Sequence, residues 1–285
     1  MNDPVVTSAA NPRFKRIRSL IQSARERRRE GASVLEGIHL VDSWLVHRQR
    51  QHDTAIELAI AQRGQGAGDI ADIVARAGVT PLVIQDRLFD SLRTMPSPAP
   101  VLAVVRTPEP ALPPGIEEDT VVLDRIQDPG NVGAILRSAA AAGIARVITT
   151  PQTAWCWSPK VLRAAMGGHF GLSIHESHPW SVLAGLVRIP VAGALAHGGT
   201  SLYDQDLTPP CVWVFGNEGD GLDAAIDRRL DWRLTIPQAS HVESLNVAAA
   251  AAVCLFEQRR QRLGTGATAR IRQPPGRPAT PAPAG

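Results

Sequence analysis

The sequence predicts an α/β protein built from two units, and three observations support this prediction. Segments with strand character alternate with segments of helical periodicity along most of the chain. A run from Thr107 to Gly115 contains four prolines, which lack the backbone donor that helices and sheets need, and the alternation restarts after it. The regular alternation in the second part is typical of a mainly parallel sheet covered on both faces. We therefore expect units at residues 1–106 and 119–262, joined by a linker at 107–118.

The first unit reads as a small α/β domain. Apolar residues at helical spacing, such as Ile38, Val41 and Leu45, indicate helices, and short β-branched runs indicate strands. The expected elements, in order, are a basic helix 11–28, strand 33–36, helix 38–49, strand 55–61, helix 69–77, strand 81–84, helix 87–92 and strand 101–105.

The second unit begins with a strand at 121–123 and a long helix from Asn131. Further strands are expected at 147–148, 172–174, 191–195 and 212–215. The last helix is expected from Ser244, as its N-cap, to Arg260. Residues 263–285 are rich in Pro, Gly, Ala, Thr and Arg without apolar periodicity, so we expect a disordered tail there.

Charge is unevenly distributed along a chain whose net charge is only +3. Eight basic residues stand against three acids in the first 30 positions, and nearly all of the basic ones are arginine, which binds phosphate in a forked geometry. This pattern fits a nucleic-acid contact, although a solvated helix face would also explain it. The basic residues are Arg13, Lys15, Arg16, Arg18, Arg25, Arg27, Arg28 and Arg29.

Other sequence features point to a cytoplasmic protein without metal. No run approaches the roughly 18 uncharged apolar residues of a membrane span, and the arginine-rich N-terminus lacks the apolar core of a secretory signal. The three cysteines show no close pairing, which is typical of a reducing compartment. No Cys/His set has zinc-ligand spacing.

Three segments of the second unit carry polar residues where a strand ends or a helix begins. In the first, Asp128-Pro129-Gly130-Asn131 forms a turn that caps a helix carrying Arg137 about two turns later. In the second, a buried strand opens into Gly216–Gly221, whose glycines let backbone groups approach a flat ligand. In the third, Ile236-Pro237 leads to Ser244-Leu245-Asn246. Each segment alone is also explained by capping or by an ordinary loop.

Together, in this order, the segments resemble the three motifs of the SpoU branch of the SPOUT RNA methyltransferases. The first matches D-P-x-N-x-G-x-x-x-R without a gap and the second matches G-N-E-G-x-G-L in full. The third keeps I-P and S-L-N-V but has Gln238 and Ser240 where methionine and glycine are usual. An intermediate segment, Ser158 to Gly167, matches S-x-K-x-x-R-x-S-x-G with Ala165 in place of the second serine. The resemblance covers about 140 residues.

The first unit resembles the RNA substrate-binding domain often fused to this family. Asn11 to Lys15, Leu35-Glu36-Gly37 and Thr94 are the matching points, and Pro98-Ala99-Pro100 replaces the usual Pro-Gln-Gly. The resemblance implies that basic residues of this unit contact RNA. The candidates are Arg13, Lys15, Arg16 and Arg18.

The resemblance implies methyl transfer from S-adenosylmethionine to an RNA ribose 2'-hydroxyl, on a sheet whose C-terminal part forms a trefoil knot. Arg137, Asn131, Glu218 and Asn246 would be the catalytic residues, with Glu218 orienting the Arg137 guanidinium. The implied cofactor-binding residues are Gly193, Ala194, Gly216, Asn217, Gly219, Gly221, Ile236 and Leu245.

Several alternatives stay open from the sequence. Arg137 either accepts the hydroxyl proton or, since a guanidinium holds its own proton tightly, clamps a phosphate and polarises the hydroxyl. A catalytically inactive RNA-binding relative and a base-directed methyltransferase are the competing functions. We expect rRNA rather than tRNA as substrate, and a homodimer formed with the help of the final helix.

Overall fold

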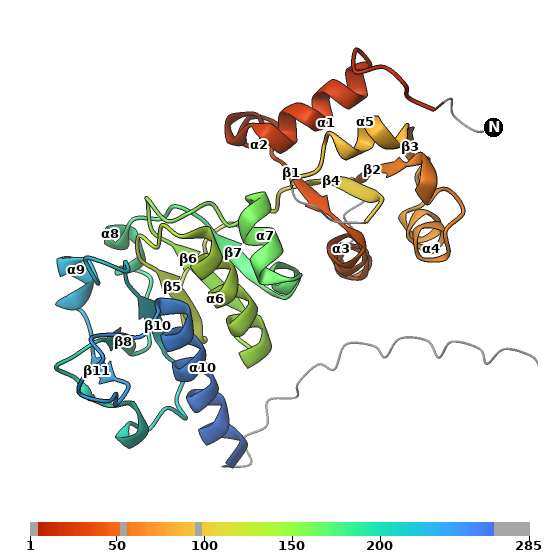
Figure 1. The fold of residues 1–285 in the computed structure, drawn as a ribbon. Helices are drawn as coiled ribbons and strands as arrows, with labels where there is room; N and C mark the ends of the chain where they lie inside the picture. The colour runs from red at the N-terminus through yellow and green to blue at the C-terminus, as the bar shows by residue number, and fades with distance from the viewer. Residues whose placement is uncertain (1–4, 52–55, 95–98, 265–285) are drawn as a thin grey trace, which may run out of the picture.

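The computed structural model describes residues 5–51, 56–94 and 99–264, without the side chains of residues 48–51. These residues form a four-stranded sheet and a seven-stranded sheet, each with its own helices (Figure 1). The expected tail at 263–285 lies outside the described residues from 265 onward. Among the described helices, none is long and apolar enough to cross a membrane.

The first sheet has the strand order β1-β4-β2-β3. Strand β4 pairs antiparallel with both β1 and β2, and β2 pairs in parallel with β3. Helices α1, α2 and α5 cover one face and α3 and α4 the other (Figure 1). The elements are α1 (Pro12–Gln22), α2 (Ala24–Glu30), β1 (Ala32–Glu36), α3 (Ile38–Gln51), β2 (Ile56–Ala61), η1 (Gln62–Gly64), α4 (Gly68–Ala77), β3 (Leu82–Ile84), α5 (Asp86–Asp90) and β4 (Val101–Arg106).

Both faces of this sheet are buried because its strands present apolar side chains alternately to the two helical layers. Leu58 and Ile60 of β2 pack with α3 and α4, whereas Ala59 and Ala61 pack with α1 and α5. The basic helix expected over 11–28 is broken at Ser23, which adopts an extended backbone and accepts a hydrogen bond from Glu26 N. Ser23 thus ends α1 and caps α2.

The second sheet contains seven parallel strands in the order β7-β6-β5-β10-β8-β11-β9. This confirms the expected mainly parallel sheet, while the trefoil knot stays a prediction. The elements are β5 (Thr120–Leu123), α6 (Pro129–Ala142), β6 (Arg146–Thr149), α7 (Pro159–Ala165), η2 (Gly168–Gly171), β7 (Ser173–His175), α8 (Trp180–Leu183), β8 (Val191–Leu195), β9 (Thr200–Ser201), η3 (Leu202–Asp204), β10 (Val212–Phe215), α9 (Ala224–Asp227), β11 (Trp232–Thr235) and α10 (Val247–Gly264).

Helices cover both faces of the parallel sheet. Val121 and Leu123 face a core shared with α6, α7 and α10, and Val122 faces the core under α8 and α9. Strand β11 was missed by the sequence reading because its Trp232-Arg233-Leu234-Thr235 pattern alternates with charge and is only four residues long.

The prediction for the start of the last helix was wrong by two residues. The helix begins at Val247, and Asn246 rather than Ser244 caps it, because Asn246 Oδ1 accepts hydrogen bonds from Ala248 N (2.9 Å) and Ala249 N (3.3 Å). Ser244 is an exposed loop residue.

Candidate active site

The candidate site lies where the order of the parallel strands reverses. From β5 the chain moves outward through β6 to β7, whereas β10 and β8 lie on the other side of β5. Crevices at the carboxyl ends of strands at such a reversal are the usual ligand sites of open α/β sheets. The loops that follow β5 and β10 carry the first and second motifs, so the topology brings these two motifs together.

A buried carboxylate ties these two loops to each other. Asp124, only 2% exposed, follows β5 and accepts hydrogen bonds from Thr150 Oγ1 (2.9 Å) and from Asp223 N (2.8 Å). Arg125 has a left-handed backbone (φ 54°), pairs with Asp124 at 3.3 Å and donates to Gly221 O at 3.2 Å. The sequence reading did not single out these two residues, although a charged pair directly after a buried strand was a usable signal.

The second motif folds back on itself as a closed loop. Asn217 and Gly221 exchange two backbone hydrogen bonds of 3.0 Å, and a Cβ on Gly216 would lie 2.6 Å from Gly221 C. Asn217 Oδ1 accepts from Gly219 N and Asp220 N, while its Nδ2 donates to Arg125 O at 2.8 Å. Gly216 is therefore required by the chain itself, and Asn217 acts as the internal brace of the loop.

Gly219 differs from the other glycines of this loop. A Cβ there would meet only Asn217 Oδ1, at an ordinary contact distance of 3.5 Å, and its backbone φ is not in the left-handed region. Gly221 has a φ of +69° and needs glycine for that reason. The fold of the chain thus does not explain a glycine at position 219.

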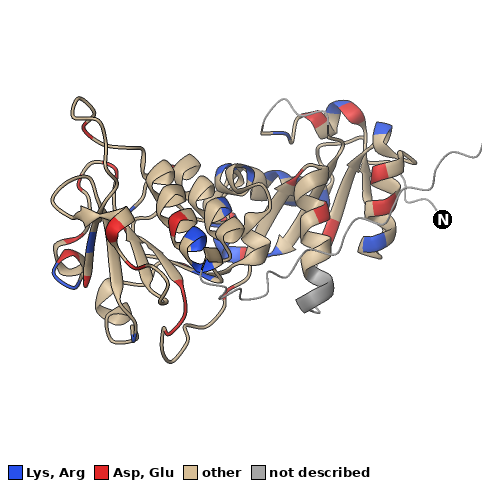
Figure 2. Cartoon of the chain, turned by 90° about the horizontal axis from the view of Figure 1, so that it is seen from below, with Lys and Arg blue, Asp and Glu red and all other residues tan. Residues whose placement is uncertain are grey.

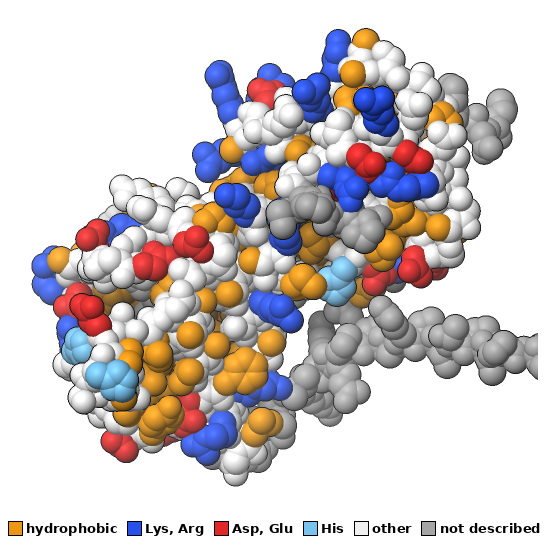
Figure 3. Space-filling model, in the orientation of Figure 1, with side chains coloured by type: hydrophobic (Ala, Val, Ile, Leu, Met, Phe, Trp, Pro, Cys, Tyr) orange, Lys and Arg blue, Asp and Glu red, His pale blue; other side chains and the backbone are white. Residues whose placement is uncertain are grey.

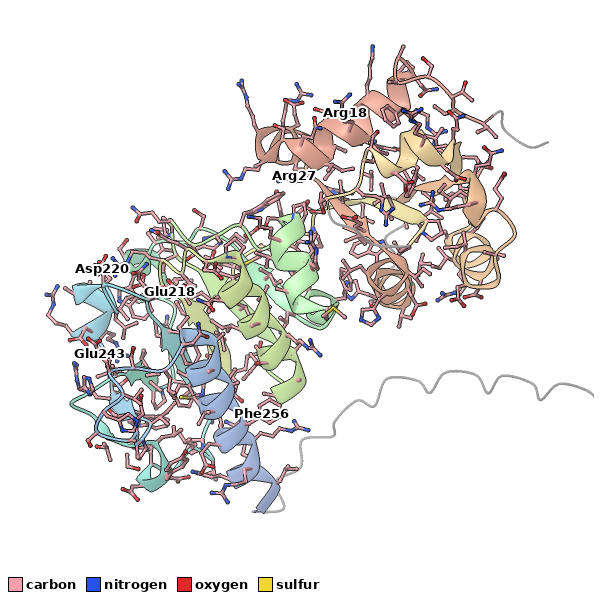
Figure 4. All side chains as sticks on the ribbon, in the orientation of Figure 1. Arg18, Arg27, Glu218, Asp220, Glu243 and Phe256 are labelled. Atoms are coloured by element: carbon pink, nitrogen blue, oxygen red, sulfur yellow. The ribbon has the colours of Figure 1, made fainter. Side chains whose placement is uncertain are left out.

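Three polar side chains, one from each motif, form a continuous hydrogen-bonded row. Asn131 Nδ2 donates to Glu218 Oε1 (2.8 Å), and Asn246 Nδ2 donates to Asn131 Oδ1 (2.9 Å). Asp128 caps α6 by accepting from Asn131 N at 2.8 Å, which fixes the first turn of that helix. Figure 4 shows Glu218 beside the first turn of α10. The row joins the start of α6, the glycine loop and the start of α10 at one point.

Arg137 lies farther along α6, exposed to solvent. Among the described residues no carboxylate pairs with its guanidinium, and the expectation that Glu218 orients this group is not met, since Glu218 accepts from Asn131. Its backbone is held closely: a Cβ on Gly168 would lie 3.0 Å from Arg137 Cα. The main chain of Arg137 is therefore fixed while its charged head is available.

The remaining expected cofactor residues differ in how exposed they are to solvent. Ile236 is 9% exposed and Leu245 is 38% exposed. Packing alone explains a glycine at position 193, because a Cβ there would lie 2.5 Å from Leu230 Cδ1. Ala194 follows it on β8 and is half-buried.

The chemistry of these loops fits a nucleoside-containing cofactor. Gln238 Oε1 is buried and has no hydrogen-bond partner among the described residues, so it is an acceptor without a donor. It belongs to the third motif, two residues after the apolar Ile236. An adenine-bearing group has an apolar ring face that can pack against Ile236, and it has hydrogen-bond donors that can pair with Gln238 Oε1.

The basic residues of α1 and α2 differ in how much of their charge is free. Arg13 and Arg16 form ion pairs with Glu57 at 2.9 and 2.6 Å, and Arg16 also pairs with Glu30. Lys15 and Arg18 are exposed on the same helix. Figure 3 shows that Lys and Arg side chains gather over the part of the molecule that carries α1 and α2, and Figure 2 marks the Lys and Arg positions along the ribbon.

Arg27 and Arg28 face the second unit. Their guanidinium groups lie 5.3 and 5.6 Å from the ring centre of Trp155, which precedes α7. Burial lowers the pKa of Arg27, whose Nη1 donates to Leu20 O and Ile21 O. This part of the arginine cluster therefore joins the two units.

A family model, the SpoU rRNA Methylase family, matches residues 119–256. A Synechocystis protein named as an uncharacterized tRNA/rRNA methyltransferase is 31% identical over 268 residues, covering 90% of this chain and 94% of that protein. A 23S rRNA (uridine(2479)-2'-O)-methyltransferase of Streptomyces viridochromogenes is 30% identical, over 92% of this chain and 94% of that protein.

Among solved structures, the SpoU methyltransferase AviRb from Streptomyces viridochromogenes in complex with AdoMet matches with a TM-score of 0.76. Its sequence identity is 27%, and the match covers 89% of this chain and 100% of that chain. An rRNA methyltransferase from Sinorhizobium meliloti matches with a TM-score of 0.77 at 28% identity, covering 91% and 98% of the two chains. The similarity therefore extends over both sheets.

Proposed function

Because the chain belongs to the SpoU rRNA methylase family, we propose that it transfers the methyl group of S-adenosylmethionine to a ribose 2'-hydroxyl of 23S rRNA. The observation that carries the proposal is the row Asn131–Glu218–Asn246, in which all three motifs meet at the strand reversal. The preference for rRNA over tRNA rests on relatives that are named as 23S rRNA 2'-O-methyltransferases. Such a substrate implies a cytoplasmic protein.

The residues of the glycine loop and the third motif would hold the cofactor. Gly219 leaves space beside the loop, Ile236 and Leu245 supply apolar contacts, and Gln238 Oε1 supplies an acceptor. When bound, S-adenosylmethionine supplies a methyl group made electrophilic by its sulfonium. The protein has to align the ribose oxygen with that methyl group and lower the cost of removing the hydroxyl proton.

Arg137 is the residue proposed to act on the RNA side. Its guanidinium is exposed and has no carboxylate partner among the described residues, so it is free to bind two oxygens of a phosphate in a forked geometry. A clamped phosphate fixes the adjacent ribose, and the cation polarises the hydroxyl. Asn131, Glu218 and Asn246 position the loops around it through their hydrogen bonds.

The first unit is proposed to capture the RNA. Residues 1–106 carry the basic helices, and 107–118 connect them to the proposed catalytic unit at 119–262. Lys15 and Arg18 are the best candidates for phosphate contacts because their charges are exposed, whereas Arg13 and Arg16 are already paired with Glu57. Phosphate contacts of this kind position an RNA without reading its sequence.

A homodimer is part of the proposal. On α10, Ala249 and Phe256 are exposed and lie two turns apart in one row, in which Phe256 is 45% exposed and the half-buried Val253 between them also packs against the core. The loop before the helix adds exposed Val242 and Leu245. Figure 3 shows apolar side chains gathered on the part of the molecule where α10 lies, and Figure 4 labels Phe256 on that helix. A second copy would bury this row and cover the third motif.

The decisive experiment maps 2'-O-methylation in the rRNA of a strain that lacks the gene. One ribose should lose its methyl group, and a plasmid copy should restore it, while Arg137→Ala should not. Arg137→Lys should also fail, because lysine cannot clamp two oxygens at once. Loss of a base methyl group with all ribose methyl groups retained would show a base-directed enzyme. Light scattering of the wild type and of Phe256→Glu tests the dimer, which the acidic variant should dissociate.

A further inference from the structure

A hydrogen-bonded relay crosses the boundary between the two units. Arg163, on α7 of the second unit, donates from Nη2 to Thr94 Oγ1 at 2.9 Å. Thr94, which follows α5 in the first unit, donates in turn to Glu36 Oε2 at 2.6 Å. The direction of both bonds is fixed because an arginine only donates and the Thr94 hydroxyl has one proton to give. The relay thus connects a cation to a carboxylate through one hydroxyl group.

The relay is reinforced by the turn that follows α7. Met166 and Gly167 both have left-handed backbones, with φ of 48° and 83°, which makes this turn sharp. His39 Nε2, on α3, lies 3.2 Å from Met166 O, and a Cβ on Gly167 would lie 2.9 Å from Ser43 Oγ. The turn is therefore seated directly on α3 of the first unit.

The same turn reaches the backbone of Arg137. Gly168, the next residue, packs so tightly on α6 that a Cβ would lie 3.0 Å from Arg137 Cα and 3.3 Å from Leu136 O. Helix α7 is equally close to α6, since a Cβ on Gly133 would lie 2.4 Å from Ala164 Cβ. Backbone-to-backbone contacts leave little slack, because no flexible side chain lies between them.

We propose that Arg163 is a positioning residue which, through Thr94 and Glu36, sets the angle at which the first unit presents RNA to Arg137. The inference rests on the proposed function. The stacking of Arg27 and Arg28 on Trp155 is a second, separate contact between the units. Loss of the relay should leave the units attached at Trp155 and where the turn after α7 contacts α3, and should widen the range of angles between them. RNA would still bind, and its ribose would no longer be held at Arg137.

The test compares Thr94→Val, which removes the hydroxyl at nearly constant volume, with Thr94→Ser, which keeps it. Single-turnover methyl transfer is measured with saturating rRNA fragment and S-adenosylmethionine, and the Kd of each is measured separately. Thr94→Val and Arg163→Ala should slow the transfer about tenfold, as expected when a charge-assisted hydrogen bond is lost, and should change either Kd less than about twofold. Thr94→Ser should stay near the wild type.

Two controls separate positioning from other roles. The double variant Thr94→Val/Arg163→Ala should be no slower than either single variant, because both remove the same relay. Arg87→Ala removes an exposed arginine on α5 and should have no effect. An unchanged rate at saturating RNA would overturn the proposal, and so would a raised RNA Kd with an unchanged rate, which would mean that Arg163 binds RNA itself.

A further measurement does not depend on activity. Spin labels on α1 and α9 report the distribution of distances between the two units in the full chain. The distribution should broaden in Thr94→Val and Arg163→Ala and stay narrow in Thr94→Ser. Unchanged distance distributions in the two variants would refute the positioning role, whether or not the wild type methylates RNA. Broadened distributions in the variants, together with a wild type that methylates no RNA, would count against the proposed function alone.

Discussion

Reversing the polarity of the Asn131–Glu218 hydrogen bond is the sharpest test of the row that joins the three motifs. Asn131→Asp keeps the shape of the side chain but replaces the amide donor, which lies 2.8 Å from Glu218 Oε1, with a second carboxylate oxygen. The bond to a charged acceptor, typically worth about 1.5–3 kcal/mol, is lost. Two like charges at that distance would add about 1.5 kcal/mol of repulsion even in water.

The expected effect on activity follows from these magnitudes. The glycine loop is partly exposed and relaxes away from the introduced carboxylate, which relieves the repulsion, so the lost hydrogen bond leaves a cost of about 1.5–3 kcal/mol in all. If this cost falls on the assembled site, single-turnover methyl transfer slows about 10- to 100-fold, because about 1.4 kcal/mol corresponds to a factor of ten. The cofactor Kd should rise along with it, since Glu218 belongs to the glycine loop.

The matched rescue is the double variant Asn131→Asp/Glu218→Gln. The amide introduced at position 218 donates to the carboxylate introduced at position 131, whose other oxygen accepts from Asn246 as Asn131 Oδ1 did at 2.9 Å. Both contacts are rebuilt, the first with donor and acceptor exchanged, so the rate should return to within about threefold of the wild type. A double variant no faster than Asn131→Asp would refute the reasoning, because Asn131 or Glu218 would then act on the substrate rather than on the other.

Three other predictions concern the cofactor, the core and the RNA surface. Gly219→Val should abolish the binding of S-adenosylmethionine measured by calorimetry. Its melting temperature should stay unchanged, because a Cβ at position 219 meets only Asn217 Oδ1 at 3.5 Å, whereas Gly216→Ala should destabilise the fold, since its Cβ would lie 2.6 Å from Gly221 C. Normal binding by the valine variant would exclude the loop as the cofactor site. Burial lowers the pKa of His169 to about 4 from an ordinary 6.5, so its contribution to stability is complete above pH 6.5 and is lost as the pH falls to 4; this amounts to about 3 kcal/mol. Chemical denaturation at several pH values should show a flatter profile for His169→Gln, which keeps a donor for Cys156 O but does not titrate, and an equally steep profile would contradict this assignment. Lys15→Glu/Arg18→Glu should weaken RNA binding and reduce the slope of log K against log salt by about two, as expected for two lost phosphate contacts; an unchanged slope would mean that these side chains are only a solvated surface.

Local sequence signals were sufficient for most of the fold. Apolar periodicity and the proline run at 108–114 predicted a mainly parallel second sheet, because most strands there are buried on both faces and read as apolar runs. The motif residues Asn131, Glu218 and Asn246 were also identified from the sequence. Local signals gave wrong predictions where they were short or where two residues competed. Strand β11 is short and contains a charged residue, and both Ser244 and Asn246 are residue types that cap a helix.

The tertiary structure alone decided how these residues are used. No spacing indicates that Asn131 and Glu218, 87 positions apart, share a hydrogen bond, because that contact depends on the order of β5 and β10 in the sheet. Likewise, the pairing of Arg13 and Arg16 with Glu57, and the relay from Arg163 to Glu36, depend on which strands and helices become neighbours. Sequence patterns report which side chains are buried or exposed, since burial follows from local periodicity. Which charges are neutralised, and which units are held together, is determined by long-range pairing, and a single sequence does not encode that in any local pattern.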